Sequence, residues 1–168
     1  MAKKILFTFL AITLTLFTFT DISFSAGATV GSKAPEFSLN DLNEKPVSLK
    51  EFGNNKAVLL VFWATWCPYC VQEIPELKRI NSEYKDKGLE IIAVDIRENP
   101  ALVSDFAKKQ GIDYTIVIDA DGSVSKDYNV VGIPTNVLID KNGIIQYNAN
   151  PMPSKKLIDK LIKEIDVK

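Results

Sequence analysis

The chain contains two cysteines, Cys67 and Cys70, and only two residues separate them. They follow an apolar run at residues 57–63 and stand where a helical pattern begins. A thiolate at Cys67 would therefore meet unpaired backbone N–H groups and the positive end of the helix dipole, which favour its ionisation near neutral pH. The spacing and position predict a dithiol that opens and closes as a disulfide.

Other interpretations of the cysteine pair fit less well. Structural thiols would not need this spacing, and a zinc site needs about four ligands, whereas the chain has no further cysteine and no histidine. A haem attachment motif carries histidine directly after the second cysteine, where this chain has Val71. We expect no metal and no cofactor.

The first residues read as a targeting segment. Lys3 and Lys4 precede an apolar run at residues 5–19, and small residues follow up to Ala28. Cleavage after Ala28 or after Ser25 satisfies the small-residue rule, and we divide the chain into a signal peptide at residues 1–28 and a domain at residues 29–168. A retained membrane anchor is the alternative, although the run falls short of the ~20 residues that span a bilayer. We expect export to a periplasmic or other extracytoplasmic compartment, where disulfides persist.

The elements that must position the cysteines follow from hydrophobic periodicity. A content of 46% hydrophobic residues suits a packed core, and a net charge of −1 gives no sign of nucleic-acid binding. Strands are predicted at residues 37–39, 47–49, 57–63, 89–96, 114–118, 136–139 and 144–147, and helices at 68–87, 100–111, 123–128 and after Ser154. The two nearly continuous apolar strands, 57–63 and 89–96, indicate the buried centre of a parallel sheet.

The helices should each present one apolar face and end at defined signals. Pro75 is predicted to interrupt and kink the helix at 68–87, and Gly88 to stop it. Asn99 and Pro100 open the next helix. The predicted apolar faces comprise Ile74, Leu77, Ile80 and Tyr84, then Leu102, Val103 and Phe106, then Leu157, Leu161 and Ile165. This order, with the cysteines after the first long strand, predicts a three-layer α/β/α thioredoxin fold with a mixed sheet and an N-terminal β-hairpin.

Three stretches carry a resemblance to a known family. They are Gly-Ser-Lys-Ala-Pro-Glu-Phe-Ser-Leu at 31–39, Phe-Trp-Ala-Thr-Trp-Cys-Pro-Tyr-Cys at 62–70 followed by Glu73 and Pro75, and Gly-Ile-Pro-Thr at 132–135. Together they resemble the TlpA/ResA/DsbE branch of the thioredoxin superfamily, over essentially all of residues 31–168. Members of that branch are exported, often membrane-tethered thiol:disulfide oxidoreductases.

The resemblance implies roles for individual residues. Cys67 would be the exposed nucleophile and Cys70 the buried resolving thiol, while Pro134 would be a cis-proline that faces them. An Ile133–Pro134 bond can adopt cis at modest cost, and the Ile133 backbone would pair with a bound peptide. The substrate-binding set would be Trp66, Pro68, Tyr69, Ile133 and Pro134.

Glu73 is suggested as a third catalytic residue. It stands three positions after Cys70, so on a helix the two residues lie close together. It could accept or relay the proton that Cys70 must lose. The alternative is a first-turn glutamate that only favours the helix dipole. The resemblance implies a need for such a relay, because Val61 stands where cytoplasmic thioredoxins bury an aspartate.

Two departures from the branch affect the prediction. The dipeptide Pro68-Tyr69 is shared with glutaredoxins and some periplasmic disulfide isomerases, so the redox direction does not transfer directly. Relatives usually place a glycine before the last helix, where this chain has Asn-Ala-Asn-Pro-Met-Pro at 148–153. That loop could border the active site or be a plain connector.

The leading functional prediction is a reductase of disulfides in exported proteins, with apocytochrome c implied as one substrate and a membrane thiol donor as the source of electrons. We expect a monomer. An oxidase or isomerase would run the same exchange in the other direction. A peroxiredoxin-like peroxidase would have threonine three residues before the cysteine, where this chain has Ala64, with Thr65 one position closer. A non-catalytic chaperone or binding module is a further alternative.

Overall fold

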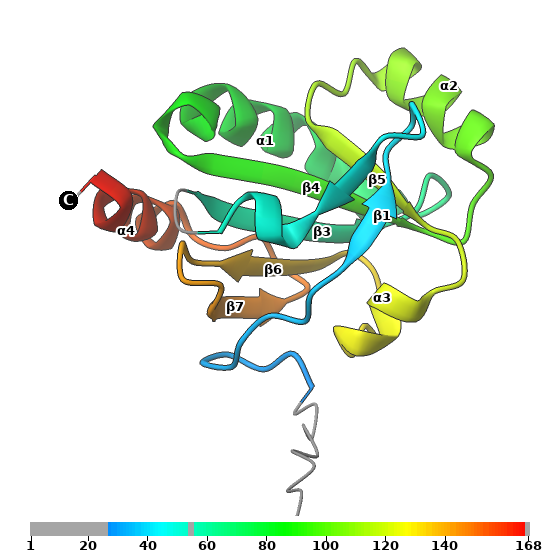
Figure 1. Ribbon diagram of the computed structural model, residues 1–168. Coiled ribbons are helices and arrows are strands. Elements are labelled where there is room, and N and C mark those ends of the chain that lie inside the picture. The colour runs from blue at the N-terminus through cyan, green and yellow to red at the C-terminus, as the bar shows by residue number, and fades with distance from the viewer. Residues whose placement is uncertain (1–26, 54–55, 167–168) are drawn as a thin grey trace, which may run out of the picture.

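The computed structural model of the chain describes residues 27–53 and 56–166 (Figure 1). Its centre is a five-stranded sheet in the order β5-β4-β3-β6-β7. The strands are β3 (Ala57–Trp63), β4 (Leu89–Ile96), β5 (Thr115–Asp119), β6 (Thr135–Ile139) and β7 (Ile145–Ala149). The pairs β3–β4 and β4–β5 are parallel, whereas β3–β6 and β6–β7 are antiparallel. The predicted thioredoxin fold with a mixed sheet is confirmed.

The sheet is covered on both faces, because alternate residues of its strands point to opposite sides. Leu59, Val61 and Trp63 of β3 enter one core with α1 (Pro68–Tyr84), α2 (Pro100–Gln110) and α4 (Lys155–Asp166). Val58, Leu60 and Phe62 enter the other core with α3 (Ser123–Asp127) and the N-terminal segment. All seven residues of β3 are buried, as its apolar run predicted.

The predicted N-terminal hairpin is present as β1 (Ser38–Asn40) and β2 (Pro46–Ser48), which pair in antiparallel fashion. A further antiparallel bridge joins Asp41 to Val117, so the hairpin lies beside β5 (Figure 1). Phe37 and Val47 bury their side chains in the second core. The predicted signal segment, apart from Gly27 and Ala28, lies outside the described residues.

Helix α1 is continuous through Pro75, so the predicted interruption there is wrong, while the predicted kink stays a prediction. Proline at this position removes one backbone hydrogen bond, but burial of Ile74 and Leu77 on either side holds the helix against the sheet. After α1, a 3₁₀ turn at Lys85–Lys87 leads to Gly88, whose φ of 96° ends the element as predicted.

One predicted apolar face, that of α2, needs correction. Leu102 of α2 is 51% exposed, and Val103 and Ala107 are the residues that this helix buries. Phe106, also predicted for this face, is partly buried against the same core. In α4 the predicted face is confirmed: Leu161 is buried, Leu157 and Ile165 pack against the core, and Ile158 and Ile162 are buried beside them. Within the residues that the structure describes, no helix is both long and apolar enough to cross a membrane.

Candidate active site

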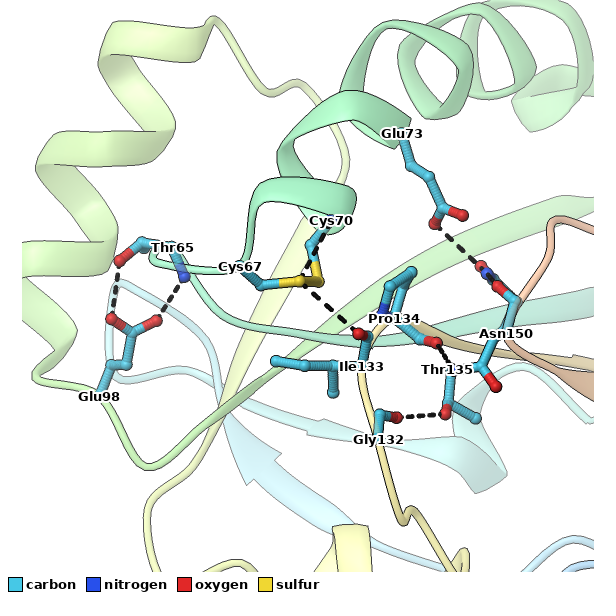
Figure 2. Close-up of a disulfide and its surroundings, with 11 residues drawn as sticks. Thr65, Cys67, Cys70, Glu73, Glu98, Gly132, Ile133, Pro134, Thr135 and Asn150 are labelled. Atoms are coloured by element: carbon cyan, nitrogen blue, oxygen red, sulfur yellow. Dashed lines mark hydrogen bonds between the residues drawn. A yellow bond between two sulfur atoms is a disulfide. The ribbon is translucent and has the colours of Figure 1, made fainter.

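The two cysteines lie at the junction between β3 and α1 and form a disulfide, with their Cα atoms 5.3 Å apart (Figure 2). Cys67 is the N-cap of α1, and the backbone N–H of Cys70 donates to Cys67 Sγ at 3.2 Å. Pro68 occupies the first helical position, where its missing N–H leaves no bond unmade. The helix thus directs its positive end at Cys67 Sγ, an arrangement that stabilises negative charge there.

Both cysteines are 3% exposed in this disulfide state. The resemblance implied an exposed sulfur at Cys67, and the structure departs from that implication. The neighbouring aromatic side chains are the accessible ones: Trp66 is 69% and Tyr69 is 71% exposed. Pro68 is exposed as well. The predicted contact residues of the motif therefore surround a covered sulfur pair.

The loop before β6 faces the disulfide. The Ile133–Pro134 peptide bond is cis, and the carbonyl oxygen of Ile133 lies 3.7 Å from Cys67 Sγ. Thr135 supports the loop by donating its hydroxyl to the carbonyl oxygen of Gly132 at 2.7 Å. Residues more than sixty positions apart in the sequence are brought together here, in the arrangement that the sequence predicted (Figure 2).

Glu73 is connected to this loop through two asparagines that the sequence analysis did not select. The fully buried Asn136 donates its side-chain amide to Glu73 Oε2 at 3.3 Å and to the carbonyl oxygen of Asn150 at 2.8 Å. Asn150 in turn donates its side-chain amide to the carbonyl oxygen of Pro134 at 2.6 Å. The loop at 148–153 thus contacts the cis-proline, one of the two possibilities left open by the sequence.

The electrostatics of Glu73 favour a proton-exchanging group. Its side chain is half-buried, and burial raises the pKa of the Glu73 carboxyl, while the hydrogen bond from Asn136 opposes that rise. Val61, on the strand below, is buried and uncharged. The pKa of the Glu73 carboxyl therefore lies above that of an exposed glutamate.

A second acidic contact lies on the other side of the disulfide. Thr65, two residues before Cys67, donates its backbone N–H to Glu98 Oε2 at 2.6 Å and its hydroxyl to Glu98 Oε1 at 2.7 Å. Figure 2 shows Glu98 and Glu73 on opposite sides of the sulfur pair. The sequence analysis missed Glu98, because nothing in a sequence reveals that residues 65 and 98 meet.

Comparisons with known proteins agree with this geometry. The Redoxin family matches residues 29–162. The chain is 37% identical over 136 residues to the "Thiol-disulfide oxidoreductase ResA" of Bacillus thuringiensis, a match that covers 81% of this chain and 78% of the relative. It is 38% identical over 136 residues, with the same coverage, to the protein of that name in Geobacillus kaustophilus.

Solved structures give the same result. The thioredoxin domain of a thiol-disulfide oxidoreductase from Bacteroides vulgatus superposes with a TM-score of 0.71 at 28% identity, covering 82% of this chain and 99% of that one. A thiol:disulfide interchange protein of the thioredoxin family from Chlorobium tepidum superposes with a TM-score of 0.69 at 27% identity, covering 82% and 97%.

Proposed function

The chain belongs to the Redoxin family and is a thiol:disulfide oxidoreductase of the ResA type, and from this we propose that it reduces disulfides in exported proteins. The observation that carries the proposal is the Cys67–Cys70 disulfide at the start of α1, beside the cis-proline loop. A sulfur at a helix N-terminus, next to a backbone carbonyl and bordered by exposed aromatic side chains, suits attack on an extended peptide that contains a disulfide.

The proposed reaction transfers two electrons and two protons from the dithiol to the substrate. The thiolate of Cys67 attacks one sulfur of the substrate disulfide, so that a Cys67–substrate bond forms and the substrate S–S bond breaks. Cys70 then loses its proton and attacks Cys67 Sγ, which forms the Cys67–Cys70 disulfide and releases the second substrate thiolate. Protons from the enzyme thiols end on the two substrate thiols or in solvent.

Glu73 is proposed to take up the proton that Cys70 loses in the second step. Its position on α1, three residues after Cys70, and the raised pKa of its half-buried carboxyl support this role. The alternative of a first-turn glutamate that serves only the helix dipole is wrong, because α1 begins at Pro68 and its first turn holds no acidic residue. Trp66, Pro68, Tyr69, Ile133 and Pro134 would contact the substrate, with the Ile133 backbone pairing with an extended segment.

The cellular setting forms the second part of the proposal. We propose export through residues 1–28, action outside the cytoplasm as a monomer, apocytochrome c among the substrates, and reduction of the Cys67–Cys70 disulfide by a membrane thiol donor. The support is the resemblance of the motifs to the TlpA/ResA/DsbE branch, together with a targeting pattern at the N-terminus. Both cysteines of the sequence form the one dithiol, which each turnover leaves oxidised, and a membrane thiol donor is proposed to reduce it again.

The contacts of Ala28 distinguish between the two proposed signal-peptide cleavage positions. Ala28 is 3% exposed in the second core, and its carbonyl oxygen accepts a hydrogen bond from the Asn148 side chain at 2.7 Å. Cleavage after Ser25 keeps these contacts, whereas cleavage after Ala28 removes them. Of the two positions, the one after Ser25 is therefore better supported, and a mature protein that begins with Ala26 is the expected product.

The proposal is tested by trapping. In the producing cells, Cys70→Ser leaves Cys67 able to attack but removes the resolving thiol, so substrates should accumulate as mixed disulfides with Cys67. The matched control, Cys67→Ser with Cys70→Ser, should capture none. Captured apocytochrome c would support the named substrate, and its absence among abundant captured exported proteins would remove it.

The direction of the exchange needs a separate measurement. Equilibration of the wild-type dithiol with glutathione or thioredoxin should give a reduction potential toward the reducing end of the range of about −270 to −120 mV seen in this superfamily. A potential at the oxidising end would reverse the proposed direction and indicate an oxidase or isomerase. The Pro68-Tyr69 dipeptide is the observation that favours this alternative.

A further inference from the structure

Asp95 is a buried acid directly behind the contact between Thr65 and Glu98. It lies on β4 between Trp63 of β3 and Ile118 of β5, and it is 0% exposed. Its Oδ1 accepts the backbone N–H of Glu98 at 3.3 Å. Its Oδ2 is buried and has no donor among the residues that the structure describes. A buried carboxylate oxygen without a donor is costly, and a proton on that oxygen removes the cost.

Glu98 supplies an acceptor for such a proton. Asp95 already accepts the backbone N–H of Glu98, and burial, reinforced by the neighbouring Glu98 carboxylate, raises the pKa of Asp95 to about 8. Both oxygens of Glu98 already accept hydrogen bonds from Thr65. Because both Glu98 oxygens are already engaged as acceptors, Asp95 is the carboxyl of the pair that carries the proton.

The other residues around Asp95 place no further charge beside the Asp95–Glu98 pair. Its strand partners Trp63 and Ile118 carry no charge. On α2, the charged side chains of Asp105 and Lys108 are 85% and 76% exposed, and the guanidinium of Arg97 bonds to the backbone carbonyl of Asp121. When the disulfide is reduced, the thiols of Cys67 and Cys70 on the adjoining turn are the further ionisable groups.

We propose that Asp95 is a positioning residue for the turn at residues 65–67, which carries Cys67. Its proton forms a hydrogen bond to Glu98, and the pair holds Thr65. Loss of that proton loosens the turn. The inference goes beyond the proposed function and rests on it only for the reaction of Cys67. No covalent bond changes in this step. A proton passes from Asp95 to solvent, and the two carboxylates then repel each other.

The first test measures the turn itself, by hydrogen exchange of the Thr65 amide in the oxidised protein. The protection factor, which corrects for the intrinsic pH dependence of exchange, should fall by about tenfold between pH 6 and pH 9.5, the scale of one hydrogen bond to a charged group. In Asp95→Asn the side-chain amide donates to Glu98 at every pH, so protection should stay constant. Glu73→Gln, on the other side, should behave as wild type.

Protection of Thr65 that is constant in wild type, or that falls equally in Asp95→Asn, would overturn the proposal. Should Asp95→Asn not fold, the carboxyl-carbon chemical shift of Asp95 in wild type gives the answer: a midpoint near pH 8 supports the proposal, and one near the ordinary value of about 3.9 refutes it. Neither measurement involves thiol–disulfide exchange. A result that refutes the role of Asp95 therefore leaves the proposed function intact.

The consequence for chemistry is measured separately. In Cys70→Ser protein, the pH profile of Cys67 alkylation should contain an inflection near pH 8 that Asp95→Asn removes and Glu73→Gln retains. A profile unchanged by Asp95→Asn would show that the pair does not act on Cys67.

Discussion

The two sides of the disulfide hold carboxyl groups in different ways. Glu73 is half-buried, and the hydrogen bond it accepts from Asn136 is 3.3 Å long. Glu98 accepts two bonds from Thr65 at 2.6 and 2.7 Å, with the fully buried Asp95 behind it. A loosely held carboxyl can gain and lose a proton with little rearrangement, whereas a doubly held one is suited to fixing geometry. The comparison indicates that position beside a reactive sulfur does not by itself determine an acid's role.

The causes of the pKa shifts differ in the same way. Burial raises the pKa of both Glu73 and Asp95, but the amide of Asn136 opposes the rise at Glu73, whereas the charge of Glu98 reinforces it at Asp95. The two sides should therefore titrate independently, and variants on each side should affect different measurements.

The largest difference between the Glu73 side and the Glu98 side of the disulfide is expected in the rate at which Cys70 resolves a mixed disulfide. Glu73→Gln keeps an oxygen for the Asn136 amide but cannot take up a proton, so resolution of a mixed disulfide by Cys70 should slow by about 10²-fold at pH 7. Asp95→Asn should change that rate by less than roughly threefold, because Asp95 is already mostly protonated at pH 7. Acid quenching of the reaction with a peptide disulfide measures the mixed disulfide directly. Equal slowing in both variants would remove the distinction between the two sides.

The next effect is on the pH dependence of stability, and it is expected at Asp95. Between the unfolded pKa of about 3.9 and the folded value of about 8, the folded protein binds a proton that the unfolded chain has lost, so the free energy of unfolding falls as pH rises and levels off above pH 8. Asparagine cannot ionise. At about 1.4 kcal/mol for each pH unit below the folded value, the stability advantage of Asp95→Asn over wild type should therefore grow by roughly 4 kcal/mol between pH 5 and pH 9.

Urea unfolding of the oxidised proteins at several pH values measures this change. Glu73→Gln is the control, and its advantage should grow in the same direction but less, because that carboxyl is only half-buried. Parallel pH profiles for wild type and Asp95→Asn would mean that Asp95 is ionised in the folded protein.

The contrast between the sides also marks what the sequence could predict. The long apolar runs located β3 and β4 to the residue, and the motifs selected Cys67, Cys70 and Pro134, which the fold does bring together. These features depend on local spacing, which a sequence contains.

The supporting polar residues were missed because their partners are distant in the sequence. The apolar pattern predicts only that Asp95 lies in a buried strand, although a single acid within an apolar run is itself a signal of a paired or functional carboxyl. Asn136 was read as a strand residue, and Asn150 belonged to a loop whose contact with the site was left open. Only the antiparallel pairing of β6 with β3 and β7 brings these asparagines to Glu73 and Pro134.

A smaller effect is expected from the hydroxyl of Thr65. Thr65→Val keeps the backbone N–H bond to Glu98 and the side-chain shape but removes the hydroxyl donor to Oε1, so the oxidised protein should lose about 1 kcal/mol of stability. Thr65→Ser retains the donor and should lose less. Urea unfolding at pH 7 compares the two, and equal losses would indicate that the hydroxyl bond contributes nothing to holding the turn.

The smallest effect is expected at Asn150, which joins the Glu73 side to the cis-proline. Asn150→Ala removes the side-chain donor to the Pro134 carbonyl but keeps the backbone carbonyl that accepts from Asn136. Because the side chain lies partly in solvent, water can replace the donor, and the loss should be about 0.5 kcal/mol with a fall in peptide-disulfide reduction of less than roughly threefold. Asn142→Ala, in the exposed β6–β7 turn, is the matched control. A fall much larger than threefold, absent in the control, would mean that Asn150 sets the position of the cis-proline loop, and that the amides on this side fix geometry as firmly as Glu98 does on the other.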